Sequence, residues 1–134
     1  METVQKTKLG LVLATDPRWV NIAEMQLEDI LSDHAWCEQK AATTCISLIV
    51  KFAHYPGIVE QVAPVVAEEW GHFRRVLKEL NKRGLRLLPP RKDDYVNQLF
   101  ACEKRGLTPV QIVVEKLLLS AMIEARSCER FRLL

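Results

Sequence analysis

The 134-residue sequence has no apolar run long enough to cross a bilayer and no alternation of polar and apolar residues typical of strands. It also lacks internal repeats and low-complexity segments. Near the amino terminus only a brief apolar stretch follows Lys6 and Lys8, without the cleavage-site pattern of a signal peptide. These absences argue against a membrane protein and a secreted protein, so we expect a cytoplasmic protein with no membrane partner.

The spacing of the cysteines does not match that of a thiolate metal site. The four cysteines, Cys37, Cys45, Cys102 and Cys128, include no Cys-x-x-Cys pair. A zinc site built on them is therefore not expected. Since they fall within helical patterns, we expect reduced, buried thiols.

What the sequence does contain is helical periodicity. With 49% hydrophobic residues, the chain is large enough for one domain, residues 1–134, with its own core. Helix-end signals predict helices at about 17–23, 24–54, 58–82, 93–104 and 110–134. Among them are Gly84 after the second long helix, Asp93 or Asp94 before the shorter helix and Thr108 before the last. The last helix has no stop signal, which predicts a chain cut short after its third long helix. The expected fold class is all-α.

Acidic residues lie on the apolar stripes of all three long helices. Glu69 and His72 are three residues apart on the second helix, so both side chains point to one side. Glu38 is central in the stripe of the first helix, and Glu124 in that of the last. Buried acids need partners. A hydrogen-bonded structural pair is the alternative for Glu69 and His72, but inward acids on two further helices favour a metal ion.

A carboxylate-bridged pair of metal ions in a four-helix bundle needs a Glu from each of two helices and Glu-x-x-His from the other two. The sequence supplies both single acids and one Glu-x-x-His pair, and the second pair is missing. His34, one turn before Glu38, is expected to support the ligands without binding the metal itself. The same oxygen and nitrogen donors also accept manganese or zinc.

Three motifs resemble the tRNA hydroxylase family of the MiaE type. They are DHAWCEQKAA at residues 33–42, EEWGHF at 68–73 and IEARSCERF at 123–131. The resemblance extends over about Trp19 to Leu134, and the third motif is the most specific. Members of that family are ferritin-like non-haem diiron monooxygenases that hydroxylate the isopentenyl group of a methylthio-isopentenyl-adenosine next to the tRNA anticodon.

The resemblance implies a ferritin-like four-helix bundle and two iron ions. Dioxygen would be a co-substrate, and an external reductase would donate electrons. The implied ligands and catalytic residues are Glu38, Glu69, His72 and Glu124, with Glu69 and Glu124 as bridging carboxylates. The partner would be the tRNA anticodon stem-loop. Because the family's remaining Glu and His have no counterpart in this sequence, a homodimer through the face left open by the missing helix is a further expectation.

Positive charge is concentrated after the second helix's Glu-x-x-His pair. Between residues 74 and 92 there are eight bases and a single acid, Glu79. The bases are Arg74, Arg75, Lys78, Lys82, Arg83, Arg86, Arg91 and Lys92. This segment suits an RNA backbone. A solvated helix end whose bases complement the helix dipole is an equally good interpretation, and no RNP1-type motif is present.

Two other function classes stay open at the level of sequence. A ferritin-like metal-storage or peroxide-scavenging protein would use the same ligands without RNA. A non-catalytic, truncated helical fragment would associate with itself through the groove left by the missing helix. Absence of tRNA binding would favour the first, and a concentration-dependent dimer without iron would favour the second.

Overall fold

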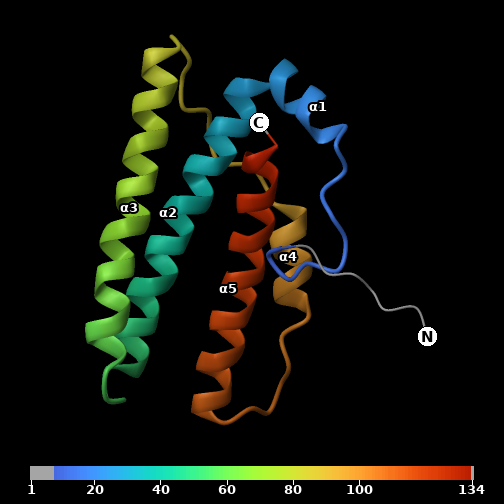
Figure 1. Cartoon of the computed structure of the whole chain (residues 1–134). Coiled ribbons are helices and arrows are strands. Elements are labelled where there is room, and N and C mark those ends of the chain that lie inside the picture. Colours follow the sequence, from blue (N-terminus) through green and yellow to red (C-terminus); the bar gives the residue numbers. More distant parts are fainter. Residues whose placement is uncertain (1–7, 134) are drawn as a thin grey trace, which may run out of the picture. The chain divides into compact units, whose positions relative to one another are not determined.

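The computed structural model describes residues 8–133, and every regular element in this range is a helix. The helices are α1 (Trp19–Met25), α2 (Leu27–Phe52), α3 (Ile58–Lys82), α4 (Asp94–Ala101) and α5 (Pro109–Arg132) (Figure 1). The prediction of an all-α chain is confirmed. Within the described range no helix combines the length and the apolar character needed to span a membrane.

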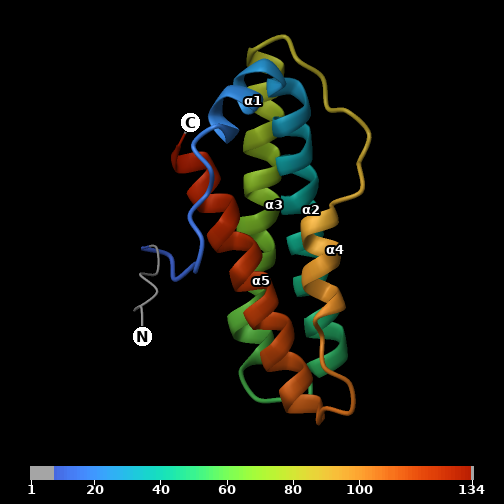
Figure 2. The ribbon, with the colours of Figure 1, turned by 90° about the vertical axis from the view of Figure 1, so that its right-hand side faces the viewer.

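The chain forms two compact units. One consists of α2, α3 and the segment that follows α3 as far as Lys92, and the other contains α1, α4 and α5. In the first unit α2 and α3 lie side by side and run in opposite directions (Figure 1, Figure 2). Gly57, at φ 81°, makes the turn into α3 in a left-handed conformation that residues with a side chain rarely adopt.

The core of the α2–α3 unit is a small apolar cluster. Ala35 of α2 is fully buried against Phe73, Val76 and Leu80 of α3. The three α3 residues recur at steps of three and four, which places them on one face of the helix. Through this face α3 packs against α2, in the turns that follow Glu69 and His72 along the chain.

Helix α3 ends where its sequence predicts. Gly84, at φ 69°, follows the last turn, its N–H donates to Asn81 O at 3.1 Å, and the Leu85 N–H donates to Leu80 O at 2.9 Å. This pair of bonds satisfies carbonyls that the end of the helix leaves open. Leu85 and Leu87 then pack against the core cluster, so the chain is turned back over the unit.

Residues 85–92, here called the strap, are held by side chains of α2. Ser32, which is 1% exposed, accepts a hydrogen bond from Leu88 N at 3.0 Å. Trp36 Nε1 donates to Leu88 O at 2.8 Å. At the end of the strap Arg91 forms ion pairs with Asp29 at 3.1 Å and with Asp33 at 2.5 Å. Side chains of α2 therefore provide the hydrogen-bond partners of the Leu88 N–H and C=O, which in a strand would be bonded to a neighbouring strand.

The predicted helix boundaries need two corrections. The helix expected at 24–54 is divided at Gln26, whose φ of −130° is not helical, and α2 ends at Phe52. The short helix expected at 93–104 ends at Ala101, followed by the cap residue Cys102. Pro64 lies inside α3 without ending it.

In the second unit the predicted caps are present. Thr108 and Gln111 form a reciprocal capping box at the start of α5, and Asp93 accepts from Val96 N at the start of α4. Arg126 on α5 contacts both Glu129, at 3.5 Å, and Thr15 Oγ1, at 3.1 Å. These contacts fasten the segment that precedes α1 to the end of α5.

The cysteines are all free, as predicted, but the expectation that they are buried is wrong for two of them. Cys37 and Cys45 on α2 are half-buried, whereas Cys102 and Cys128 are exposed. Burial, and to a smaller extent Glu69, raises the pKa of the Cys45 thiol. A protonated thiol is a poor metal ligand.

We expect Ser32→Ala to destabilise the α2–α3 unit by about 1–3 kcal/mol, because it removes the acceptor for the Leu88 N–H at a buried position. Urea denaturation of the metal-free chain measures this change. Ser47→Ala, at an exposed serine of the same helix, is the matched control and should leave the midpoint unchanged. Equal effects of the two substitutions would show that the hydrogen bond from Leu88 N to Ser32 adds nothing to stability.

Candidate metal centre

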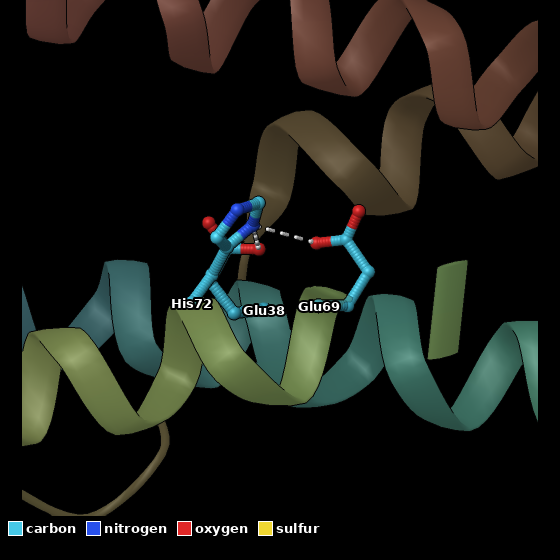
Figure 3. A group of neighbouring side chains, drawn as sticks. All are labelled: Glu38, Glu69 and His72. Carbon is cyan, nitrogen blue, oxygen red and sulfur yellow. Dashed lines mark ion pairs between the residues drawn. The ribbon is translucent and has the colours of Figure 1, made fainter. Parts of the chain in front are cut away.

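Glu38, Glu69 and His72 come together in the α2–α3 unit. Glu38 is buried in the middle of α2, between Ala35 and Ala42, one turn away on either side. Glu69 and His72 lie one turn apart on α3, and their side chains and that of Glu38 converge on one side of the α2–α3 pair (Figure 3). The three-residue step predicted from the sequence therefore does place the last two side by side.

The donor atoms lie at separations that suit a shared ion. His72 Nδ1 is 3.4 Å from Glu69 Oε2 and 3.7 Å from Glu38 Oε2. One donor atom from each residue can be chosen so that all three fall within 4.8 Å of one another. Atoms bound to one ion at about 2.1 Å lie up to about 4.2 Å apart. The two distances from His72 Nδ1 fall within this limit, which suits a common metal ion.

Burial makes a cation the natural partner. The Glu38 side chain is 8% exposed and that of Glu69 14%. Glu69 Oε2 is buried and accepts no hydrogen bond from the described residues. Two neighbouring carboxylates in a poorly solvated place repel each other, and a divalent ion would offset both charges. Carboxylate oxygen and imidazole nitrogen are donors that iron accepts.

His34 holds the second oxygen of Glu38. Its Nε2 lies 3.2 Å from Glu38 Oε1, one helical turn along α2. Burial lowers the pKa of His34 to about 4, and the nearby His72 contributes in the same direction while Glu69 opposes it. A neutral imidazole protonated on Nε2 can donate to Glu38 Oε1, which leaves Oε2 directed at His72. The predicted supporting role of His34 agrees with this geometry.

Glu68 is a neighbour of the site that the sequence did not predict. Its Oε1 lies 4.0 Å from His72 Nε2, the nitrogen on the far side of the ring from the other two carboxylates. The spacing of four residues along α3 was the available clue. Since the Glu68 side chain is 66% exposed, water screens this contact and its energetic contribution is small.

The fourth predicted ligand, Glu124, lies in the middle of α5, in the second unit. The three donors that converge in the first unit, Glu38, Glu69 and His72, do not include Glu124. The role of Glu124 as a bridging carboxylate stays a prediction.

The eight predicted phosphate-binding bases fall into different groups. Arg83 is engaged with Glu79 at 2.8 Å, and Arg91 with Asp29 and Asp33. The other six form no ion pair with any described residue from 8 to 133. They are Arg74, Arg75, Lys78, Lys82, Arg86 and Lys92, all exposed.

We expect Glu69→Gln to weaken metal binding by more than about tenfold, because one of three donors loses its charge. Thermal unfolding with increasing Mn²⁺, or with Fe²⁺ under anaerobic conditions, measures the affinity through the metal-dependent rise in Tm. Glu60→Gln, an exposed acid in the first turn of the same helix, should behave as the unsubstituted chain. Identical metal dependence of all three proteins would exclude Glu69 as a ligand.

His34→Leu should weaken metal binding by about tenfold, because the orientation of Glu38 is lost while all three donors remain. His34→Gln, whose amide nitrogen can take the place of Nε2, should recover most of the affinity. Chelator competition gives the affinities, and the visible spectrum of bound Co²⁺ reports the ligand geometry. If the Leu and Gln variants weaken binding equally, His34 fills space without positioning Glu38.

The chain is similar to known proteins over nearly its whole length. A family model described as tRNA-(MS[2]IO[6]A)-hydroxylase (MiaE) matches residues 2–134. A Pseudomonas putida protein named tRNA 2-(methylsulfanyl)-N(6)-isopentenyladenosine(37) hydroxylase is 37% identical over 131 residues. That match covers 98% of this chain and 63% of the relative, so the chain spans less than two thirds of the relative's length.

A solved structure has the same fold. It is named as Protein 43 with aldehyde deformylating oxygenase activity from Synechococcus, and it matches with a TM-score of 0.82 and 34% identity. The match covers 90% of this chain and 59% of that one. The predicted ferritin-like fold class is confirmed. Since the family model matches nearly every residue, the chain belongs to the MiaE tRNA hydroxylase family.

Proposed function

We propose that this chain carries the metal-binding helices of a dioxygen-dependent diiron monooxygenase that hydroxylates the isopentenyl group of a methylthio-isopentenyl-adenosine in tRNA. The observation that carries the proposal is the convergence of Glu38, Glu69 and His72 between α2 and α3. The name of the Pseudomonas putida relative supports the substrate class. The anticodon stem-loop is the proposed partner.

Glu38, Glu69 and His72 would hold iron, and Glu124 is proposed as a further iron ligand. Bound iron would supply the redox chemistry that activates dioxygen. Hydroxylation converts a C–H bond to C–OH and reduces the second oxygen atom to water, which consumes two electrons and two protons. An external electron donor is therefore part of the proposal.

The chain's own residues prepare the site for this chemistry. His34 fixes the orientation of Glu38 through its Oε1 atom. Ala35 and Ala42, which are 0% and 4% exposed, flank Glu38 along α2, and the Glu38 side chain is itself only 8% exposed. A preoriented donor set binds a metal without having to rearrange.

The test has two parts, made on chain purified from iron-replete cells. Metal content per chain is measured first. The reconstituted protein is then given dioxygen, a chemical reductant and tRNA containing the methylthio-isopentenyl nucleoside, and nucleoside mass spectrometry detects the gain of one oxygen atom. We expect iron in the chain and product from it, with none from Glu69→Gln and normal yield from Glu60→Gln.

Other outcomes would contradict the proposal and favour the alternatives. Bound iron with rapid peroxide consumption, and no tRNA product, would indicate a ferritin-like storage or scavenging protein. Absence of bound metal, together with a concentration-dependent dimer, would indicate a helical fragment that does not catalyse the reaction.

A further inference from the structure

Four basic residues lie on the side of α3 opposite its buried side. Arg74, Arg75, Lys78 and Lys82 are exposed, and a helical step of 100° per residue places all four within one arc of about 100°. The buried Phe73, Val76 and Leu80 occupy the other side of the helix. We call these four bases the α3 basic face.

The charge of this face is not neutralised within the described chain. Glu79 is the single acid between residues 74 and 92, and it pairs with Arg83 at 2.8 Å. Asp29 and Asp33 of α2 pair with Arg91. Glu79, Asp29 and Asp33 are thereby engaged by Arg83 and Arg91. The four bases of the α3 basic face form no ion pair with any described residue from 8 to 133.

The composition of the face suits a nucleic-acid backbone better than a protein surface. Protein interfaces generally contain buried aromatic or aliphatic anchors, and the other residues of this arc between Pro64 and Lys82, namely Pro64, Ala67 and Gly71, supply no large apolar side chain. A Cβ added at Gly71 would meet no atom within 4 Å, so the surface there is open. From Arg74 to Lys82 the face extends about 12 Å, a length over which a strand carries several phosphates.

We infer that the α3 basic face binds the sugar–phosphate backbone of RNA, and that Arg83 and Arg91 hold the fold together and do not contact the RNA. This inference rests on the proposed function, which makes tRNA the substrate. It assigns the docking surface to the same helix that presents Glu69 and His72. RNA bound there would lie about one helix diameter, roughly 10 Å, from the metal ligands.

The experiment compares two double variants that each remove one arginine and one lysine. Arg74→Gln with Lys78→Gln changes the α3 basic face, and Arg86→Gln with Lys92→Gln changes exposed strap residues outside it. Binding of a fluorescent anticodon stem-loop RNA to the full chain is measured by anisotropy over a series of NaCl concentrations. Thermal unfolding confirms that both variants fold.

Loss of two phosphate contacts should reduce the slope of log K against log salt concentration by about 1.4–1.8 and weaken binding by about tenfold or more near 0.1 M salt. The strap variant should keep the slope and affinity of the unsubstituted chain. An equal loss in both variants would overturn the inference, because net charge alone would explain it.

Two further results would also overturn the inference. Unchanged RNA binding by the α3 variant, with normal binding by the unsubstituted chain, would place the RNA elsewhere and leave the proposed function intact. If the α3 variant instead slowed iron reduction by an acidic electron-transfer protein, the face would belong to a redox partner. Failure of the unsubstituted chain to bind RNA at low salt would remove both the docking surface and tRNA as the substrate.

Discussion

Two carboxylates, the buried Glu38 and the half-buried Glu69, lie beside one imidazole in the α2–α3 unit, and the packing of this unit opposes their mutual repulsion. Like charges in a poorly solvated site repel each other and favour separation of the helices. The apolar contacts of Ala35 with Phe73, Val76 and Leu80 oppose that separation directly beside the cluster. A bound cation would replace the repulsion with attraction, so metal binding and helix packing reinforce each other.

The contacts of the strap with α2 help to fix the rotation of this helix, and with it the direction of Glu38. Ser32 and Trp36 are one turn apart and bind the strap through Leu88, whereas His34 and Glu38, two residues further along in each case, face the site. Rotation of α2 about its axis would break the strap contacts and turn Glu38 away from His72. Trp36 also packs on Phe73 of α3, with ring centroids 6.1 Å apart. The strap therefore contributes to the precision of a site that it does not line.

Local patterns in the sequence predicted the features that depend on local geometry. The caps at Gly84, Asp93 and Thr108 and the pairing of Glu69 with His72 follow from spacing along one helix. The strap could not be predicted in this way, because Ser32 and Trp36 bind backbone atoms more than fifty residues away. Nearly every residue has the same backbone donor and acceptor, so the sequence does not show which backbone group a side chain binds. The break at Gln26 was missed for a related reason, since glutamine favours helices and nothing local disfavours one there.

The sequence also does not show which of the basic residues are engaged in ion pairs. The sequence gives eight bases in one segment, and only the structure separates Arg91, which is occupied by Asp29 and Asp33, from Arg74 and Lys78. A count of charges overstates the surface available to a polyanion, because a base paired within the fold releases no counterions from RNA. On α3 the helix geometry places the basic residues and the candidate metal ligands on different sides. His72 and Arg74 are two residues and about 200° apart, so a single helix can direct one side chain to a metal and the next but one to a phosphate.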